Sequence, residues 1–502
     1  MLLVTILYQA LTIWLALYGL NSLVLTSIYL WVRQRPRCPL PPPDVWPSVS
    51  VQLPIYNELH VAERLIAAAA SLDYPRERLQ IQVLDDSTDE TATLARLAVA
   101  RWARKGLDIR YEHRIQRVGF KAGALAEGMR HATGELLAIF DADFVPPSGF
   151  LRRIVPYFGS PQVGCVQARW SHTNRDYSVL TRLQAIGIDG HFVVEQRARS
   201  GAGLFLNFNG SAGVWRRECI EDAGGWQADT LAEDLDLSYR AQLAGWRIVY
   251  AAEVAAPGEL PPQMDALRRQ QARWAQGSIR VAIKLVPALL ASDAAWPVKL
   301  EGALHLTGYL IHPLLLVILL LSFPFVLAGA RLSSLMPYFA LAAVGPPLLY
   351  LVAQVERGPG WWRELPLAPL LLLLGTGLAL NNSLAMARAV VGRTEGFQRT
   401  PKFDIRGQRG DWQVSAYALR CSNLVGWELL LAALAMGVAA LEWSRTGVAP
   451  FWLAIYAAGY AFVALASLLQ AWRESGKHRW AWLSRRARHM VAHPHSGRPP
   501  LG

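Results

Sequence analysis

The sequence predicts an α/β domain with a mostly parallel sheet, inserted between transmembrane α-helices. Apolar residues make up 53% of the 502 residues and charged residues only 18%, which is more apolar than an ordinary soluble protein and excludes a disordered chain. Long apolar runs lie on both sides of residues 48–262, and within that range short strand-like runs alternate with helix-like stretches. This alternation predicts a largely parallel sheet with helices on both faces.

The net charge of +12 lies beside the apolar runs. Three arginines fall within residues 33–37, and cations exceed anions in residues 392–421 and 472–502. Basic segments next to apolar runs are typical of chain held at an anionic membrane face. A nucleic-acid-binding protein would usually carry its excess on a folded face, so no nucleic-acid partner is expected. The four cysteines lie far apart and indicate a reducing compartment.

The N-terminal segment predicts one membrane span. Residues 1–32 contain no charged side chain and are long enough for a transmembrane helix. Because arginines follow at once, the N-terminus is expected outside and the following chain in the cytoplasm. Residues 33–47 then form a basic, proline-rich linker, and residues 48–262 form the cytoplasmic domain.

The C-terminal half predicts further spans with one exception. Residues 263–302 are expected to form amphipathic interfacial helices, and residues 303–473 contain five apolar runs. If all five crossed, the basic loop 392–421 and the basic tail 474–502 would both lie outside, against the positive-inside rule. We therefore expect four spans plus one interfacial or re-entrant segment in this region, with the loop and the tail in the cytoplasm.

Two runs are candidates for the segment that does not cross. The run 332–355 is broken by Pro346-Pro347, and the run 366–391 contains Asn381-Asn382 and Arg388. Re-entrant backbone is tolerated only where protein or a channel covers it.

Three acidic clusters lie where an α/β fold places its site, at the carboxyl ends of strands. Asp85-Asp86 follows the strand-like run Ile81–Leu84, and Asp141-Ala-Asp143 follows Leu136–Phe140. The third cluster is Glu233-Asp234, with Asp236 two residues on. The other strand-like runs are Val49–Leu53 and Val163–Val166.

The spacing of Asp141 and Asp143 predicts a shared divalent cation. Two carboxylates at a strand end can bind Mg²⁺ or Mn²⁺, with phosphate oxygens completing the coordination. Each cluster alone has a structural explanation: Asp-x-Asp can cap a strand end, Asp85-Asp86-Ser87 suits a turn, and Glu233-Asp234 suits a helix start. Three clusters in order along one insert favour a catalytic site.

A fourth pattern follows in Gln270-Gln-Ala-Arg273-Trp274. An amphipathic helix at a membrane surface would explain the basic residues around it. It does not require Gln270 and Arg273 on one helix face beside an indole. Arginine can neutralise a diphosphate, and tryptophan offers a flat apolar surface to a sugar ring.

These residues together resemble the inverting family 2 glycosyltransferases. The resemblance covers roughly residues 48–290 and is greatest to the membrane-embedded, processive branch: cellulose synthase and, more closely, the plant β-mannan (glucomannan) synthase-like proteins. The motifs in order are Val51-Gln-Leu-Pro-Ile-Tyr-Asn57-Glu58, Leu84-Asp-Asp-Ser-Thr-Asp89, Lys121-Ala-Gly-Ala-Leu125, Phe140-Asp-Ala-Asp-Phe144, Phe208-Asn-Gly-Ser-Ala-Gly213, Glu233-Asp234 and Gln270-x-x-Arg273-Trp274.

The resemblance implies a GT-A fold and a role for each matching position. Asp234 would be the general base. Asp141 and Asp143 would hold Mg²⁺ or Mn²⁺ and the diphosphate. Substrate-binding positions would be Asp85 and Asp86 for the base and ribose, Lys121 for the diphosphate, Asn209 and Gly210 at the acceptor site, Glu233 beside the base, and Gln270, Arg273 and Trp274 for the diphosphate and the terminal acceptor sugar.

Two further features bear on the resemblance. The segment Arg399-Thr-Pro-Lys402-Phe403 resembles the mobile loop that caps the nucleotide in cellulose synthase, although basic loops beside membranes are common. The base motif carries Ala232 where cellulose synthases have threonine, which the mannan-synthase-like branch tolerates. Control by cyclic-di-GMP is not expected, because no cyclic-dinucleotide-binding domain is evident.

The function expected from the resemblance is processive β-glycosyl transfer. The enzyme would transfer hexose from UDP-glucose or GDP-mannose to a growing β-glycan and move the product across the membrane. It would be an integral membrane protein, taken to lie in a bacterial plasma membrane with its catalytic domain in the cytoplasm. The alternative is addition of one or a few sugars to a lipid acceptor, and a third hypothesis is a transporter or scaffold with an inactive insert.

Overall fold

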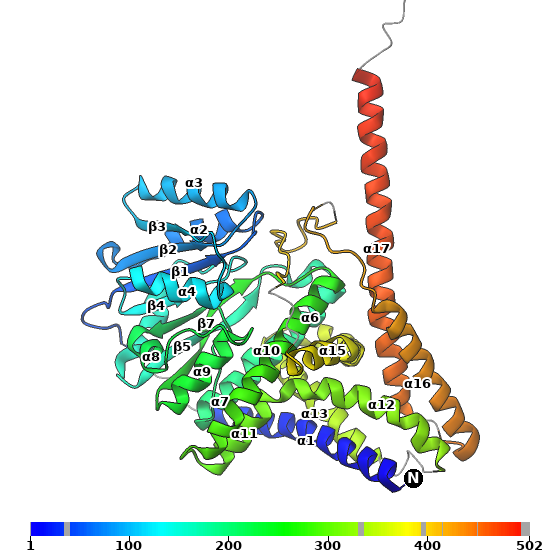
Figure 1. Cartoon of the computed structure of the whole chain (residues 1–502). Coiled ribbons are helices and arrows are strands. Elements are labelled where there is room, and N and C mark those ends of the chain that lie inside the picture. Colours follow the sequence, from blue (N-terminus) through cyan, green and yellow to red (C-terminus); the bar gives the residue numbers. More distant parts are fainter. Residues whose placement is uncertain are drawn as a thin grey trace, which may run out of the picture.

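The computed structural model describes residues 2–34, 41–329, 336–392, 398–413, 415–448 and 450–492 (Figure 1). Part of the expected linker, part of the basic loop and the last residues of the expected tail therefore lie outside the described residues. An α/β domain packs on one end of a group of long helices, to which the first and the last helices of the chain both belong.

The domain is built on one seven-stranded sheet with the order β3-β2-β1-β4-β6-β5-β7. Neighbouring strands are parallel except β6, which pairs antiparallel with both β4 and β5. The strands are β1 Val49–Ile55, β2 Leu79–Asp85, β3 Asp108–His113, β4 Leu136–Ile139, β5 Val163–His172, β6 Gly213–Arg216 and β7 Arg247–Gly258. The four strand-like runs of the sequence fall within or overlap β1, β2, β4 and β5.

Helices cover both faces of this sheet, and further long helices lie outside the α/β domain. They are α1 Leu2–Val32, α2 Ala62–Ala70, α3 Thr91–Ala103, α4 Phe120–His131, α5 Phe150–Ile154, α6 Val179–Asp189, α7 Gln196–Ala202, α8 Arg217–Asp222, α9 Glu233–Leu243, α10 Met264–Ala291, α11 Trp296–Leu306, α12 Ile311–Leu327, α13 Met336–Val355, α14 Ala368–Gly377, α15 Ala379–Val390, α16 Val425–Thr446 and α17 Phe451–Ala492. Short 3₁₀ turns include η3 Arg175–Tyr177 and η7 Trp361–Leu367, and a π-helical turn, η4, spans Gly190–Glu195.

Two apolar layers hold the sheet. Buried residues of α2, α3 and α5 pack with β1 and β2 on one face. Buried residues of α4, α8 and α9 pack on the other face, around Trp215 and Phe208. Strands β1 and β2 are buried along nearly their whole length. Their alternating polar side chains pair across the two strands, because Ser50 donates to Gln80 at 2.7 Å and Gln52 donates to Gln82 at 3.1 Å. The predicted fold class is confirmed: a mostly parallel α/β domain between apolar helical segments.

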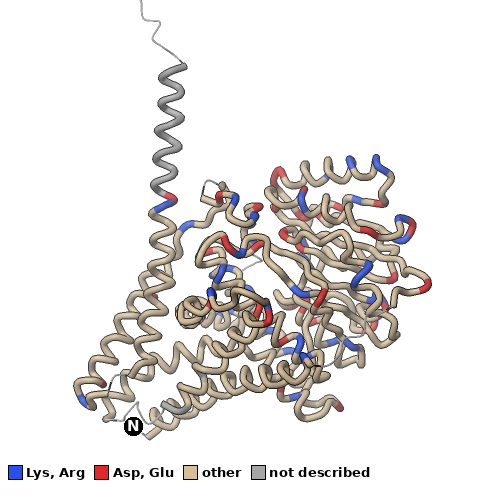
Figure 2. Tube along the Cα trace, turned by 180° about the vertical axis from the view of Figure 1, so that it is seen from behind, with Lys and Arg blue, Asp and Glu red and all other residues tan. Residues whose placement is uncertain are grey.

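Six helical segments among the described residues are long and apolar enough to cross a membrane. They are Leu2–Val32, Gly308–Leu327, Tyr338–Val355, Trp361–Val390, Val425–Thr446 and Phe451–Glu474. Figure 2 shows charged residues crowded on the α/β domain and scarce along these helices. This is the composition of an integral membrane protein.

Five of the six segments meet at one end, away from the sheet. Tyr8 near the start of α1 hydrogen-bonds Ser322 near the end of α12 at 3.0 Å. Phe339 near the start of α13 stacks on Trp452 at the start of α17, with ring centroids 4.7 Å apart. Arg445 at the end of α16 donates to the Val326 carbonyl of α12.

The sixth segment, Trp361–Val390, has both ends on the side of the α/β domain. Near its start, Glu364 accepts from Arg182 of α6 at 3.1 Å. At its end, the Ala389 carbonyl accepts from Arg280 of α10 at 3.3 Å. Between these ends, Asn381 is buried and donates to the Arg268 carbonyl at 3.0 Å, so this amide is bound by α10.

Candidate active site

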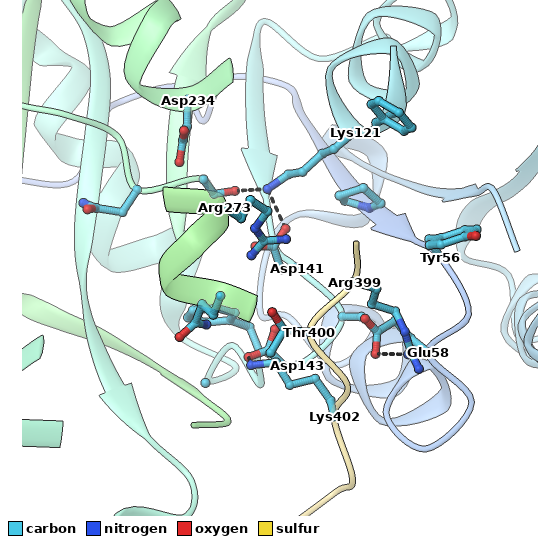
Figure 3. A pocket seen from close by; sticks show the side chains of 18 of the residues that line it. Tyr56, Glu58, Lys121, Asp141, Asp143, Asp234, Arg273, Arg399, Thr400 and Lys402 are labelled. Carbon is cyan, nitrogen blue, oxygen red and sulfur yellow. Dashed lines mark hydrogen bonds and ion pairs between the residues drawn. The ribbon is translucent and has the colours of Figure 1, made fainter. Parts of the chain in front are cut away.

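A cavity of about 200 Å³ opens at the carboxyl ends of β1, β2 and β4, where parallel α/β sheets place ligands. Its walls come from the strand ends, the start of α4, the loop before α9, one face of α10 and the segment around residue 400. Eleven of the twelve site residues predicted from the sequence line it: Asp86, Lys121, Asp141, Asp143, Asn209, Gly210, Glu233, Asp234, Gln270, Arg273 and Trp274. Figure 3 shows the side chains that point into it.

Asp141 and Asp143 follow β4 and face the cavity, and each contacts a lysine. Lys121 Nζ of α4 lies 2.6 Å from Asp141 Oδ1, and Lys402 Nζ lies 2.8 Å from Asp143 Oδ2 (Figure 3). The Asp141 backbone N–H donates to the Ser211 hydroxyl at 2.9 Å, which fixes the turn after the strand. Each of the two carboxylates is therefore paired with one ammonium group at the cavity wall.

Asp234 lies across the cavity from these two acids, at the start of α9. Its own helix supplies a backbone N–H, because Leu235 N donates to Asp234 Oδ1 at 2.8 Å. Burial and the neighbouring Glu233 carboxylate raise the pKa of Asp234 to about 7, while Lys121 opposes that rise. A carboxyl group with a pKa near neutral can take up a proton readily at physiological pH.

The backbone opposite Asp234 requires glycine. Gly210 has φ of 80°, and a Cβ there would lie 2.8 Å from Asp234 Oδ2. The Gly210 carbonyl also accepts from Lys121 Nζ at 2.7 Å. Gly210 therefore lets one turn approach both the lysine and the candidate base.

Asn209 is held in place beside that turn. Its Oδ1 accepts from Asn207 Nδ2 at 2.9 Å and lies 3.0 Å from His191 Nε2. His191 belongs to the π-helical turn η4, and such turns are frequent at functional sites. The side chain of Asn209 is therefore fixed in position at the cavity wall.

Asp86 lines the cavity, whereas Asp85 lies behind its wall. Asp86 binds the guanidinium of Arg114 through both oxygens, at 2.7 and 2.6 Å. Asp85 is fully buried and accepts from Tyr111 Oη at 2.7 Å and from Ser87 N at 3.0 Å. The pair predicted to contact base and ribose is thus divided between one acid at the cavity and one that supports the strand end.

The residues Gln270, Arg273 and Trp274 lie on the face of α10 that covers the cavity. Arg273 points toward Asp141 (Figure 3). Helix α10 also contacts α15, α11 and α17, so the same helix joins the cavity to the apolar bundle. The helix predicted as amphipathic and interfacial is therefore also a wall of the site.

The segment from Arg399 to Ile405 runs along the cavity, and its residues Arg399, Thr400 and Lys402 line the wall. Arg399 Nη1 lies 3.0 Å from Glu58 Oε2. Burial raises the pKa of Glu58 to about 8, against the opposing effect of Arg399. The Lys402 ammonium contacts Asp143 and donates to the Glu259 carbonyl.

Glu259 anchors that segment, and no pattern in the sequence marks it as a site residue. Its carboxylate accepts from Phe403 N at 2.7 Å and from Ile405 N at 3.2 Å. It is a single acid after β7, outside the motifs of the resemblance. A second unexpected contact is the guanidinium of Arg117, which lies 3.4 Å from the centroid of the Tyr56 ring at the cavity wall.

The cavity offers few side chains that could coordinate a metal ion. No group of three or more His, Cys, Asp and Glu side chains comes together as a metal site among the described residues. Asp141 and Asp143 offer carboxylate oxygens, which hard divalent cations such as Mg²⁺ and Mn²⁺ prefer. Two carboxylates suit a cation whose remaining ligands come from a phosphate and water.

A family model described as "Glycosyltransferase like family 2" matches residues 47–277, the range that contains the sheet and the cavity-facing part of α10. Over this range the domain is similar to the family 2 glycosyltransferases. A solved mannosyltransferase, PcManGT from Pyrobaculum calidifontis in complex with GDP-Man and Mn²⁺, is similar in structure, with a TM-score of 0.54 and 24% identity. The match covers 77% of this chain and 100% of that chain. This likeness shows the fold, and the expected GT-A type is confirmed.

Two curated relatives of this chain are plant proteins. Probable glucomannan 4-beta-mannosyltransferase 4 of Oryza sativa subsp. japonica is 37% identical over 70% of this chain and 64% of the relative. Glucomannan 4-beta-mannosyltransferase 2 of Arabidopsis thaliana is 46% identical over 48% of this chain and 46% of the relative. The chain thus spans less than two thirds of either relative. The predicted resemblance is confirmed, but the comparisons do not support the expected bacterial membrane.

Proposed function

We propose that this protein is an inverting β-mannosyltransferase that extends a β-glycan from GDP-mannose. The observation that carries the proposal is Asp234, a cavity-facing carboxyl whose pKa is raised to about 7, opposite the acids Asp141 and Asp143. This arrangement separates a proton acceptor from a diphosphate site across one cavity. Direct displacement between the two would convert an α-linked donor into a β-glycoside.

Asp234 would act as the general base. A sugar hydroxyl is a weak nucleophile, and a carboxylate within hydrogen-bond reach can accept its proton as attack occurs. Glu233 contributes by keeping the pKa of Asp234 high enough for that transfer. Lys121, between Asp141 and the Gly210 carbonyl, would carry positive charge toward the departing diphosphate.

Asp141 and Asp143 would hold the divalent cation, Mg²⁺ or Mn²⁺. Their oxygens and their position at the strand end fit such an ion, which when bound would neutralise charge on the diphosphate. Arg273, directed at Asp141, and Lys402 would add fixed cationic groups around the same phosphates. Asp86 lines the end of the cavity expected to hold the nucleoside.

The acceptor sugar would lie between Trp274, Asn209 and Asp234. An indole offers an apolar face to a sugar ring, and the amide of Asn209 can bind a hydroxyl. All three residues line the cavity. A growing chain held there would present its terminal hydroxyl to the base.

The topology that accompanies this function has five spans. The N-terminus and the catalytic domain would lie on opposite sides, and Trp361–Val390 would be the re-entrant segment, because both of its ends contact the α/β domain. The basic loop and tail would then lie with the catalytic domain in the cytoplasm, as the positive-inside rule requires. Because α10 connects the cavity to the helices, the product would leave through the bundle.

Two facts support mannose as the transferred sugar. The curated relatives are named as mannosyltransferases, and the solved neighbour holds GDP-Man. The testing experiment gives purified full-length protein in lipid vesicles GDP-mannose or UDP-glucose with Mg²⁺ or Mn²⁺. We expect a product from GDP-mannose that β-mannanase digests. A product formed only from UDP-glucose would contradict GDP-mannose as the donor. Label found only in the lipid fraction would favour the lipid-acceptor alternative.

A further inference from the structure

A second cavity lies apart from the active site, where the α/β domain meets the helical bundle. Its volume is about 520 Å³. Its walls come from η3 and α6 of the domain, the end of α13, the turn at residues 358–360 and the start of η7. The lining includes four arginines: Arg175, Arg182, Arg357 and Arg363.

The cavity has more cationic groups than its acids neutralise. Arg175 and Arg357 share one buried carboxylate, Asp189, at 2.7 and 3.6 Å. Arg175 and Arg182 likewise share Glu364, at 3.6 and 3.1 Å. A fourth arginine, Arg363, lies beside the ring of Trp362. Three of the four guanidinium groups thus share two carboxylates, and Asp176 is the remaining acid in the lining.

Two further details show what this arrangement lacks. Arg182 Nε is buried and makes no hydrogen bond among the described residues. Burial, together with the neighbouring Arg175 guanidinium, lowers the pKa of Arg357. An anion in the cavity would supply an acceptor for the first group and relieve the repulsion on the second.

The position of the cavity indicates where such an anion would come from. Arg33, the first cation after the apolar helix α1, pairs with Glu356, which adjoins the cavity residue Arg357. Trp362 is 59% exposed beside it, at the start of an apolar segment. Arginine and tryptophan at the end of apolar helices mark the headgroup level of a bilayer. The cavity therefore lies at the headgroup level, on the side of the catalytic domain.

We propose that this cavity binds the phosphate of an anionic phospholipid headgroup. Arginine is suited to phosphate because its planar guanidinium can donate two parallel hydrogen bonds. Basic pockets between membrane helices and their cytoplasmic flanks are places where anionic headgroups bind. The proposal does not depend on the transferred sugar, and lipid binding can be measured without catalysis.

The experiment measures phosphatidylglycerol binding to the full-length protein in detergent by native mass spectrometry. Phosphatidylcholine and inorganic phosphate are titrated in parallel. The variant is Arg363→Gln, because the recorded contact of Arg363 is with the exposed Trp362 ring. Lys299→Gln is the matched control: Lys299 lies beside the Trp296 ring on α11, outside this cavity.

We expect Arg363→Gln to weaken phosphatidylglycerol binding about fivefold, the usual effect of one cation near an anionic headgroup, and Lys299→Gln to leave it unchanged. An equal loss of phosphatidylglycerol binding in both variants would indicate general attraction to a basic surface and would contradict a specific site in this cavity. Equal binding of phosphatidylcholine would overturn the requirement for an anionic lipid. Inorganic phosphate that binds as tightly as the lipid would make free phosphate the ligand and overturn the lipid assignment.

Discussion

Lys402 and Asp143 are 259 residues apart in the chain, yet the lysine ammonium lies 2.8 Å from the carboxylate that follows β4. One belongs to the segment that crosses the cavity and the other to the proposed metal pair. The lysine therefore neutralises a carboxylate that a divalent cation would also use. If Asp143 holds the cation as proposed, the position of the segment and the occupancy of the metal site would be coupled through this one oxygen.

Lys402→Met should increase Mn²⁺ affinity of the donor-free protein, because the cation no longer competes with an ammonium group for Asp143. Electron paramagnetic resonance of free Mn²⁺ measures this directly. Lys284→Met is the control, since Lys284 pairs with Asp229 and Asp236 away from the metal pair. Unchanged Mn²⁺ affinity in Lys402→Met would remove Asp143 from the metal site.

Glu259→Gln should loosen the segment over the cavity. The carboxylate accepts two backbone N–H groups, from Phe403 and Ile405, and an amide would direct its own N–H₂ at one of them. We expect faster proteolysis within residues 398–413 and a raised KM for the nucleotide sugar. Glu253→Gln, at an exposed acid of β7, should change neither. Equal proteolysis rates would show that Glu259 does not anchor the segment.

The pH dependence of transfer should follow Asp234, which must be deprotonated to act. Because its pKa is raised to about 7, kcat/KM should fall about tenfold per pH unit below that value. Glu233→Gln removes the neighbouring negative charge, which is a main cause of the rise, so the acid limb should move to lower pH. An acid limb that stays in place would mean that another group controls it.

Asp234→Asn should lower kcat by about 10²–10⁴-fold and leave donor affinity nearly unchanged. An amide keeps the shape and can accept a hydrogen bond, but it cannot take up the proton. Arg273→Ala should weaken GDP binding as well, since in the proposed role its charge would face the diphosphate in the ground state. Calorimetry with GDP beside a radiolabelled transfer assay separates the two. Normal turnover of Asp234→Asn at saturation would exclude Asp234 as the base.

Several acidic residues that line the cavity could be predicted from the sequence, because they follow strand ends or begin a helix. Asp141, Asp143 and Asp234 come directly after a strand or at a helix start, so topology alone brings them near one sheet edge. Gln270 and Arg273 share a helix face through their spacing of three residues. Such placements depend on local pattern, which a single sequence contains.

What the sequence could not predict depends on distant contacts. Asp85 and Asp86 are adjacent and identical, yet one is paired with Tyr111 beneath the strand and the other faces the cavity. Glu259 acquires its role only because the segment near Phe403 returns to it after 144 residues. The arginine-rich second cavity likewise forms between α6 and the end of α13. No local periodicity marks these partners.

The final prediction concerns Trp361–Val390, which is long and apolar enough to cross a membrane but has both ends beside the α/β domain. A segment that crossed would have to place one end with the start of α1, where Tyr8 meets Ser322. A segment that returns leaves five spans and keeps the basic loop that follows on the side of the catalytic domain, where positive charge is favoured.

Cysteine labelling of intact vesicles tests this topology at three exposed positions. In a background with Cys38 and Cys421 replaced by serine, Trp362→Cys and Val391→Cys should react with an impermeant maleimide from the catalytic-domain side. Val448→Cys, between α16 and α17, should react only from the opposite side. Trp362→Cys and Val391→Cys decide between the two topologies. If the segment crosses the membrane, its two ends lie on opposite sides; if it is re-entrant, both ends lie on the same side. Labelling of Trp362→Cys and Val391→Cys from opposite sides would establish six spans, leave the tail of α17 on the far side, and contradict the re-entrant segment.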